Sequence, residues 1–397
     1  MTELVEAILE SMSNVKKPQK RFMCALFAVL MVFQGKATFR NLSRYSSMSE
    51  KCFSRWYRRD FDFAQFNTAL LIAEVSEQTH RIAAVDASFL SKSRSKAEGM
   101  GWFYNGSAGK AQRGLEISLL SIVDLSLNTA YALDARQTVD EDEKTRVDLY
   151  AEHVVSKASS LSKLGVKYIA ADAYYSKVKF VSAVTQAGFE LVEKLRVDAN
   201  MKWLYQGPYS GLGRPKKFDG KVNIDTDLAR FEGVESEMEG VEVYTAVVRS
   251  KHLNCKIKVV LLRWSKEEKI GTALLYSTDT QLDATTLIRY YKARFQIEFL
   301  FRDAKQHTGL THCQSRRKEA THTQVNASLS TLNLLKLEDR KEKNADTEAV
   351  ISIATWKRKK FNQHLMIRLF DKLGLSLKSE KVSQVFTRME SYGAIAA

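Results

Sequence analysis

The sequence has few cysteines, few prolines and no long apolar run, and each shortage excludes a class of protein. Its four cysteines lie far apart and form no CxxC or Cys/His cluster, so we expect neither a disulfide framework nor a zinc site. With only three prolines, the chain is not expected to contain long flexible linkers. The longest apolar stretch, residues 22–33, has 12 residues, whereas a helix needs about 20 to cross a bilayer. We therefore expect a cytoplasmic protein with reduced thiols, no membrane segment, and a buried helix at residues 22–33.

Acidic residues are also in short supply. The 397 residues include 61 Lys and Arg against 46 Asp and Glu, which gives a formal net charge of +15. Hydrophobic residues make up 45% and charged residues 27%, a balance typical of folded chains, and the length suggests two or three domains. The positive excess favours a polyanionic partner, which is either nucleic acid or an anionic membrane surface.

Most of this excess lies near the N-terminus. Residues 11–59 carry eleven Lys and Arg and one acidic residue. The pattern predicts a helical domain over residues 1–75, in which helices over 37–45 and 50–59 flank a short turn that ends at the capping residue Ser49. This is the helix-turn-helix arrangement of DNA-binding proteins, and the alternative is an ordinary solvated helical face. On the first interpretation, the DNA-binding residues are Arg40, Arg44, Lys51, Arg55 and Arg58.

Short apolar strands alternate with helices between residues 80 and 200, which indicates an α/β fold. The glycine-rich stretch 99–114 lacks the spacing of a phosphate-binding loop and is interpreted as a hairpin. Its Lys110 and Arg113 are candidates for DNA contact because they are basic residues close to Asp86, the first candidate catalytic residue.

The rest of the chain divides into a strand-rich and a helical part. Residues 201–281 are rich in β-strand patterns, and residues 316–397 are predicted to be helical. The helical part holds two basic clusters, residues 316–318 and 357–360, that we expect to grip flanking or target DNA.

Two aspartates end two of the short apolar strands. Asp86 follows the run 82–85, and Asp172 follows the run 168–171. Functional groups collect at the carboxyl ends of strands in open α/β sheets, so these side chains are expected to lie within metal-bridging distance. Each aspartate alone is also explained as a turn or cap residue, and a complete metal site needs a third ligand.

A candidate third ligand lies on a long helix predicted over residues 284–306. Four polar side chains on it recur at offsets of 0, 3, 7 and 14: Tyr291, Arg294, Glu298 and Lys305. At 100° per residue these positions fall within a sector about 60° wide. The helix therefore presents one carboxylate beside a phenol, a guanidinium and an ammonium group. The alternative is a solvated ion pair between Arg294 and Glu298.

The spacing Y-(2)-R-(3)-E-(6)-K is the signature of a subgroup of bacterial insertion-sequence transposases of the DDE type, and the chain resembles that family over about residues 80–315. Asp86 and Asp172 are similar to the first and second catalytic aspartates of the family, and Glu298 to its catalytic glutamate. The resemblance implies an α/β protein with an RNase H-like catalytic core. The expected domains are a helical DNA-binding domain (1–75), the core (80–200 and 282–315), a β-rich insertion (201–281) and a helical C-terminal region (316–397).

The resemblance also implies the chemistry. A transposase of this kind binds the terminal inverted repeats of its element, cleaves the DNA ends and transfers the 3′-OH strands into target DNA. The three carboxylates would hold two Mg²⁺ ions, or Mn²⁺ in their place, because these ions prefer oxygen ligands. Tyr291, Arg294 and Lys305 would contact DNA phosphates. The expected partners are double-stranded DNA, as inverted repeats and target, and a second copy in a homodimeric synaptic complex at the bacterial nucleoid.

Two other functions stay open at this point: a transposase-derived DNA-binding regulator without catalysis, and a metal-dependent nuclease without strand transfer. The complete set of three carboxylates argues against the regulator. Related transposases that make hairpin ends place a tryptophan on the strand before the glutamate helix, to stack on a flipped base. The strand predicted at 272–276 has none, which leaves the hairpin step open. Trp203, Trp264 or Tyr276 would be the substitute, although Trp264 is expected to be a core residue.

Overall fold

The computed structural model describes residues 2–75, 80–92, 96–139, 141–209, 211, 213–266, 269–343 and 351–394. The chain forms two compact units that interleave along the sequence. One unit comprises Met1–Thr79, Ala87–Val139 and Ile297–Ala397, and the other comprises His80–Asp86 and Asp140–Gln296.

The N-terminal part is helical, as predicted. Its elements are α1 (Thr2–Ser11), α2 (Lys17–Val32), α3 (Phe39–Leu42), the 3₁₀ turn η1 (Ser43–Tyr45), α4 (Glu50–Trp56) and α5 (Phe63–Glu74). The apolar run 22–33 forms the buried part of α2, where Phe22, Leu26 and Leu30 are at most 1% exposed. Burial of these side chains stabilises the fold by about 1.5–3 kcal/mol each.

Helices are present on both sides of the expected turn, and the first of them is shorter than the expected 37–45. Thr38 caps α3 by accepting a hydrogen bond from the backbone N–H of Asn41, so the helix starts only at Phe39. Ser49 caps α4 as predicted and accepts from the backbone N–H of Cys52. Tyr57, just after α4, is fully buried and donates a 3.0 Å hydrogen bond to the Gln324 side chain, which anchors this segment to the core.

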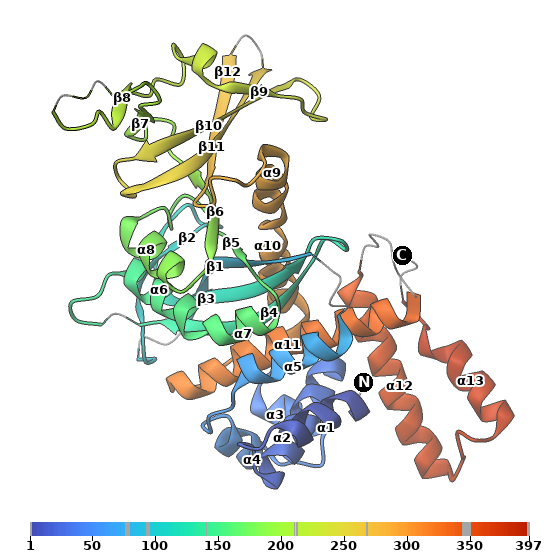
Figure 1. The fold of residues 1–397 in the computed structure, drawn as a ribbon. Coiled ribbons are helices and arrows are strands. Elements are labelled where there is room, and N and C mark those ends of the chain that lie inside the picture. The colour runs from blue at the N-terminus through green and yellow to red at the C-terminus, as the bar shows by residue number, and fades with distance from the viewer. Residues whose placement is uncertain are drawn as a thin grey trace. The chain divides into compact units, whose positions relative to one another are not determined.

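The long helix α11 (Lys318–Lys343) covers the edge strand β4 (Thr129–Thr138), with α5 beside it (Figure 1). An edge strand has backbone N–H and C=O groups without partners in the sheet. The Asn333 side chain satisfies both groups of Ala132, at 2.9 and 2.8 Å. Asn326 does the same for Ala135, at 2.8 Å in each bond. The buried amides of α11 therefore close this edge of the sheet.

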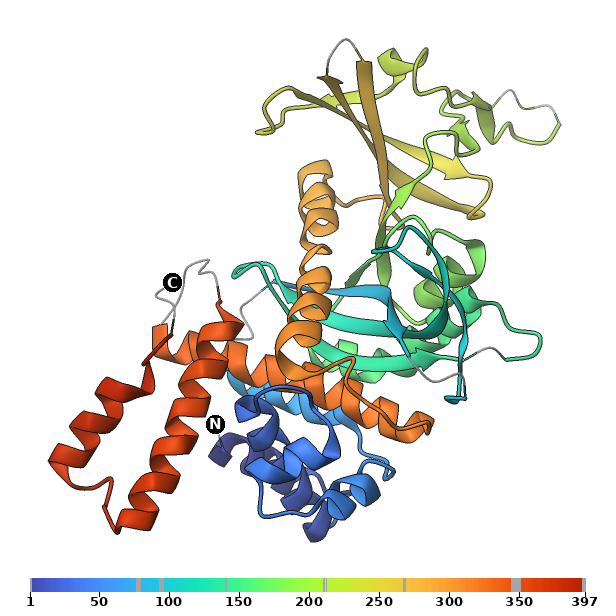
Figure 2. The same cartoon turned by 180° about the vertical axis from the view of Figure 1, so that it is seen from behind.

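The helices α12 (Ile353–Leu373) and α13 (Glu380–Glu390) form a helical hairpin near the C-terminus (Figure 2). The expectation that the basic cluster 357–360 grips DNA is wrong for most of its residues. Lys357 is buried and donates to the carbonyl oxygens of Leu30 and Phe33. Lys359 is also buried and pairs with Glu342, and Lys360 pairs with Glu338. These ammonium groups are used inside the fold because α12 packs on α2 and α11.

The strands form a twelve-stranded mixed sheet, which together with the helices at both ends confirms the α/β prediction. Its order is β2-β3-β1-β5-β6-β12-β11-β10-β7-β8, with β4 paired to β3 and β9 paired to β10. The first six strands are β1 (Arg81–Ser91), β2 (Gly101–Asn105), β3 (Lys110–Asp124), β4, β5 (Tyr168–Ala170) and β6 (Glu190–Leu195). The others are β7 (Met201–Leu204), β8 (Phe218–Lys221), β9 (Glu232–Val234), β10 (Val241–Ser250), β11 (Cys255–Lys266) and β12 (Lys269–Ser277).

Strand direction separates two parts of the sheet. β5 runs parallel to β1 and to β6, and β6, β12, β11 and β10 pair antiparallel in succession. The remaining elements of the second unit are α6 (Arg146–Ser156), α7 (Ala158–Lys163), α8 (Val178–Gln186), the 3₁₀ turn η2 (Leu228–Arg230) and α9 (Ala284–Ala293). The parallel strands β5 and β6 are joined through α8, whose buried Phe180 and Val184 pack toward β6.

Candidate active site

The two candidate aspartates lie at the same level of neighbouring parallel strands. β1 pairs with β5 in a register that places Ala83 opposite Ile169 and Ala84 opposite Ala170. Two residues further along, this register brings Asp86 level with Asp172. Neighbouring strands lie about 4.8 Å apart, so the two backbones approach closely at this level. The pairing of β1 with β5 thus places two backbone positions near each other that lie far apart in the sequence.

Asp86 does not end its strand, contrary to the prediction. β1 continues from Arg81 to Ser91, so Asp86 lies in its middle. The apolar run ends at Val85, but the backbone stays extended because the residues that follow are also paired in the sheet. Asp172 does follow the end of β5, and its carboxylate accepts a 2.8 Å hydrogen bond from the backbone N–H of Tyr174. Both side chains are partly exposed.

An arginine and a tyrosine at the end of α9 lie beside these aspartates. The Arg294 guanidinium is 3.8 Å from the Asp86 carboxylate, and the two side chains are 14% and 22% exposed. The same guanidinium is 5.9 Å from the centre of the Tyr291 ring. Burial raises the pKa of Tyr291, the nearby Asp172 charge adds to this, and Arg294 opposes it. Tyr291 therefore keeps its phenolic proton at neutral pH, and the cluster carries two carboxylates and one cation.

The long helix predicted over 284–306 is interrupted. α9 ends at Ala293, α10 (Gln296–Asp303) follows, and the last turn, η3 (Ala304–Thr308), is a π-helix. The break falls at Arg294 and Phe295. The backbone N–H of Arg294 still bonds to the carbonyl of Tyr290, but that of Phe295 bonds to Lys292, only three residues back. Phe295 is 49% exposed. The position of this interruption is difficult to predict from the sequence because neither Arg294 nor Phe295 has an intrinsic tendency to end a helix.

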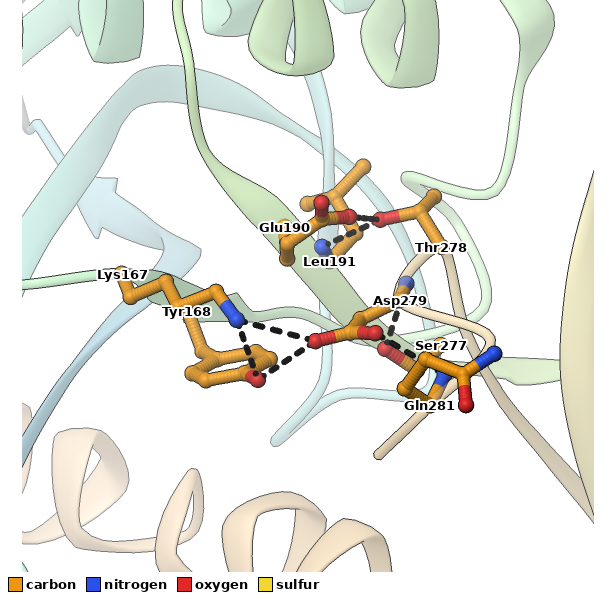
Figure 3. Close-up of polar contacts among 8 residues, drawn as sticks. All are labelled: Lys167, Tyr168, Glu190, Leu191, Ser277, Thr278, Asp279 and Gln281. Atoms are coloured by element: carbon orange, nitrogen blue, oxygen red, sulfur yellow. Dashed lines mark hydrogen bonds and ion pairs between the residues drawn. The ribbon is translucent and has the colours of Figure 1, made fainter. Parts of the chain in front are cut away.

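Asp283 caps the start of α9, and a hydrogen-bonded network around Asp279 lies just before it in the sequence. Asp283 caps the helix by accepting hydrogen bonds from the backbone N–H groups of Thr285 and Thr286. Lys167 and Tyr168 both donate to the Asp279 carboxylate, at 3.0 and 2.7 Å (Figure 3). Burial alone would raise the pKa of Asp279, but these hydrogen bonds keep it below its usual value. The charged network ties the loop before α9 to the start of β5.

Glu193 on β6 is a buried carboxyl that the sequence prediction missed. It is fully buried and accepts hydrogen bonds from the hydroxyls of Ser176 and Tyr276, at 2.7 and 2.5 Å. Burial raises its pKa to about 7, and the charge of Asp172 adds to the effect. The signal was present in the sequence, since Glu193 stands in phase with Leu191 and Leu195, which face the core.

Glu298 and Lys305 belong to the other compact unit. Glu298 lies in the first turn of α10 with a partly exposed side chain. Lys305 lies in the π turn and donates a 2.8 Å hydrogen bond to the hydroxyl of Ser88, two residues after Asp86 on β1. Among the described residues, no group of three His, Cys, Asp or Glu side chains is assembled for a metal ion. The grouping of the three carboxylates is therefore a proposal.

The predicted DNA-binding residues outside this cluster lie on two exposed surfaces. Arg40, Arg44, Lys51, Arg55 and Arg58 are all exposed in the helix-turn-helix region. Three of them, Lys51, Arg55 and Arg58, line one open hollow together with Arg59, Glu50 and Ser54. Lys51 and Arg55 lie on α4, and Arg58 and Arg59 follow its end. Lys110 and Arg113 are exposed on β3, Lys110 directly after the turn from β2 and Arg113 three residues further along.

The aromatic candidates for base stacking are placed differently from the expectation. Tyr276 and Trp203 are buried and occupied in the fold. Contrary to the expectation, Trp264 is not a core residue, since its side chain is 37% exposed. It lies directly across from Gly271 on β12 and covers the space that a side chain there would fill.

Two aspartates at one level of neighbouring strands, with an arginine and a tyrosine beside them, thus form a polar cluster on the sheet of a strongly basic chain. Comparison with known families specifies the class. The chain belongs to the family of the transposase DDE domain, whose model matches residues 77–334, more than half of the 397. The resemblance found from the tyrosine, arginine, glutamate and lysine spacing is thereby confirmed.

Family membership makes the protein a transposase, an enzyme class that acts on DNA and generally uses divalent metal ions. A search of curated proteins found none that matches this chain. None of the helices in the described ranges combines the length and hydrophobicity that a membrane crossing requires.

Proposed function

We propose that this protein binds the terminal inverted repeats of its element, cleaves the DNA ends and transfers their 3′-OH strands into target DNA. The observation that carries the proposal is the equal level of Asp86 and Asp172 on neighbouring parallel strands within the matched DDE domain. Glu298 is the third catalytic carboxylate in this proposal, since its spacing from Tyr291 and Arg294 fits the family signature.

The sheet order supports the expected RNase H-like core. β4, β3, β1, β5 and β6 are successive neighbours, and β1, β5 and β6 run parallel to one another. The strands β7 to β12 come between β6 and α9 in sequence, and β12 pairs with β6 on its return. A segment whose two ends meet at one strand can be added without disturbing the core, so we assign residues 201–281 to an insertion.

The donor set fits two divalent cations. Asp86, Asp172 and Glu298 offer only carboxylate oxygens, which Mg²⁺ and Mn²⁺ prefer, and each of these side chains is partly exposed. When bound, such ions supply activation of a water or DNA hydroxyl and stabilisation of the departing oxygen. We propose Mg²⁺ as the physiological ion, with Mn²⁺ as a substitute.

The other residues of the site bind and orient the phosphate. Arg294, 3.8 Å from Asp86, holds the carboxylate in place, and its guanidinium has the geometry to donate to a DNA phosphate. Tyr291, whose pKa is raised by burial, remains a hydrogen-bond donor for a phosphate oxygen. Lys305, which donates a hydrogen bond to Ser88 on the strand of Asp86, adds a positive charge to Arg294 and Tyr291.

The helix-turn-helix region supports recognition of the DNA ends. Lys51 and Arg55 on α4, with Arg58 and Arg59 after it, outnumber the one acidic residue of the hollow, Glu50, so the hollow is suited to a DNA backbone. Substituting Arg55 or Arg58 by Gln should reduce the slope of log K against log[salt] by about one for each phosphate that the variant no longer neutralises.

Exposed apolar side chains on the α12–α13 hairpin support a homodimer. Leu365, Leu369 and Leu373 recur on one face of α12 and are 50–62% exposed, and Val385 and Met389 on α13 are 50% and 41% exposed. A patch of this kind is rarely left open to water in soluble proteins. We propose that a second copy covers it in a synaptic complex that handles two DNA ends.

The decisive experiment is strand transfer of a pre-cut inverted-repeat end into a plasmid with Mg²⁺ or Mn²⁺. Wild-type protein should join the end to the plasmid, and Asp86→Asn, Asp172→Asn and Glu298→Gln should each lower the rate by at least about 10³-fold. Glu237→Gln, on an exposed loop, is the matched control and should keep wild-type activity. End binding should persist in all four variants.

Each remaining outcome has a separate meaning. Cleavage without joining would favour the metal-dependent nuclease, and binding without cleavage would favour the non-catalytic regulator. Wild-type activity in any one of the three carboxylate variants would remove that residue from the catalytic set.

A further inference from the structure

The buried carboxyl of Glu193 joins three segments of the second unit. β6, which carries it, lies between β5 and β12 in the sheet. Glu193 is directly opposite Tyr276 on β12, so both side chains lie on the same face, and the Tyr276 hydroxyl donates to Glu193 at 2.5 Å. Ser176, in the loop after β5, donates to the same oxygen, Oε2, at 2.7 Å. One carboxyl oxygen thus holds both β12 and the loop after β5 to the strand between them.

Asp172 lies within this loop, four residues before Ser176. At the start of the loop, the backbone N–H of Ala171 donates to the carbonyl oxygen of Val192 on β6 at 3.1 Å. At the end of the loop, Ser176 is bonded to β6 through the Glu193 side chain. Both ends of the segment that carries Asp172 are therefore bonded to the same strand.

The loop has one further anchor, the buried ring of Tyr175. This ring packs against Tyr150 of α6 and Phe180 of α8, with centroid distances of 5.2 and 5.1 Å. Burial of an apolar ring is a non-directional force, so it holds the loop down without fixing its orientation. A hydrogen bond weakens steeply when its angle departs from linear. The bond from Ser176 to Glu193 therefore adds the directional restraint that the ring does not provide.

A carboxyl at this position costs stability. The neighbours of Glu193 on the same face of β6 are the apolar residues Leu191 and Leu195, so packing alone does not require a polar side chain there. Glu193 is fully buried, and no described residue forms a hydrogen bond with its second oxygen, Oε1. An unpaired buried polar atom costs about 1–3 kcal/mol. Proteins retain such costs mainly at functional sites.

The Glu193 carboxyl is also close enough to the candidate site for their charges to interact. Besides the larger effect of burial, the charge of Asp172 raises the pKa of Glu193, and the charge of Glu193 raises the pKa of Tyr291. Asp172 and Tyr291 are partly exposed, whereas Glu193 is fully buried and out of reach of DNA. Any effect of Glu193 on the reaction therefore passes through another residue.

We propose that Glu193 is a positioning residue, which holds the Asp172 carboxylate in place for divalent-cation binding through its hydrogen bond with Ser176. This inference rests on the proposed function, in which Asp172 is a metal ligand. The ligands of a metal site have to be held within about 0.5 Å of the required geometry by the residues that support them. Supporting residues of this kind typically contribute 10- to 100-fold to metal affinity.

The test is binding of Mn²⁺ to the full-length protein, measured by electron paramagnetic resonance of the free ion. Glu193→Ala should weaken binding by roughly 10- to 100-fold. Ser176→Ala should weaken it at least as much, because the Ser176 hydroxyl also lies 3.0 Å from the carbonyl oxygen of Lys194 and the variant loses both contacts. Glu193→Gln keeps an oxygen that accepts from both hydroxyls, so its Mn²⁺ affinity should stay within about threefold of wild type.

Strand transfer with the same variants separates positioning from catalysis. In Glu193→Ala, the Mn²⁺ concentration that gives half of the maximal rate should rise by the same factor of roughly 10 to 100. The rate at saturating Mn²⁺ should stay within about threefold of wild type, because the ligands themselves are unchanged.

Asn333→Leu, in the other compact unit, is the control for lost stability. It should destabilise the protein and keep the Mn²⁺ affinity of wild type. The proposal is overturned if Asn333→Leu weakens Mn²⁺ binding as much as Glu193→Ala does, or if Glu193→Gln weakens it as much. It is also overturned if Ser176→Ala binds Mn²⁺ like wild type, and this variant alone decides if Glu193→Ala does not fold.

Failure of the proposed function gives a different result. If wild-type protein binds no Mn²⁺, or if Asp172→Asn binds it like wild type, the proposed metal site fails and this inference fails with it. If Asp172→Asn abolishes Mn²⁺ binding and strand transfer while Ser176→Ala keeps both at the level of wild type, only the positioning role is wrong.

Discussion

Glu193 should make the stability of this protein fall as pH rises through neutrality. Its carboxyl is fully buried, and burial raises its pKa to about 7 from the ordinary 4.5. Between these two values the folded protein holds a proton that the unfolded chain has released, so the free energy of unfolding declines as pH increases. A difference of about 2.5 pKa units, at 1.36 kcal/mol per unit, corresponds to about 3 kcal/mol over the whole window.

The variant that isolates this carboxyl is Glu193→Gln, which keeps the shape and still accepts from the hydroxyls of Ser176 and Tyr276. The free energy of unfolding is measured by urea titration at pH 5 and at pH 8 in metal-free buffer, so that bound cations do not contribute. From pH 5 to pH 8, the free energy of unfolding of the variant should increase by about 2–3 kcal/mol relative to that of wild type. The groups that face Glu193 are Ser176, Tyr276, Asp172 and Tyr291, and only Asp172 carries a charge that raises its pKa further.

A second variant tests the cause. Ser176→Ala removes a hydrogen bond that lowers the pKa of Glu193, so its stability should fall more steeply with pH than that of wild type. If the difference between Glu193→Gln and wild type is the same at pH 5 and pH 8, the buried carboxyl does not titrate in this window and the prediction is wrong.

Three other predictions concern packing and buried charge. Burial lowers the pKa of Lys357 to about 7. The free energy of unfolding of wild type, measured with urea, should therefore rise by roughly 3–4 kcal/mol from pH 7 to pH 10 relative to that of Lys357→Met. If the difference between the two proteins is the same at both pH values, Lys357 is not buried. The same variant should keep the wild-type salt slope of DNA binding. Asn333→Leu leaves both backbone groups of Ala132 without their partner on α11 and should cost roughly 2–4 kcal/mol, whereas a loss below about 0.5 kcal/mol would contradict the edge-covering role of α11. Gly114→Ala should cost about 1–3 kcal/mol because its Cβ meets β1, and a thermal melt equal to that of wild type would argue against this close approach.

Local patterns in the sequence predicted the elements that local forces control. The apolar run at 22–33 predicts a buried helix, and α2 is one because its side chains recur on a helical surface. Ser49 predicts the start of α4, since a cap depends only on residues within one turn. The family signature on residues 291–305 depends on spacing alone, and the family match confirms the resemblance that it indicates.

The sequence could not predict features that depend on pairing between distant segments. The level of Asp86 with Asp172 is a property of the β1–β5 register, which the packing of both strands determines. Asp86 lies inside its strand because the sheet pairing continues beyond the apolar run. The helix break at Arg294 is a further case, because neither it nor the next residue is a helix breaker.

The charged residues illustrate both what the sequence determines and what only the tertiary structure decides. Its amount and its concentration near the N-terminus are properties of the sequence, and they indicated a polyanionic partner before any fold was known. Which charges face solvent was decided by the tertiary structure: Arg55 and Arg58 line an open hollow, whereas Lys357 is buried against α2. Composition determines how many charges a chain has, but only packing decides which of them water or DNA can reach.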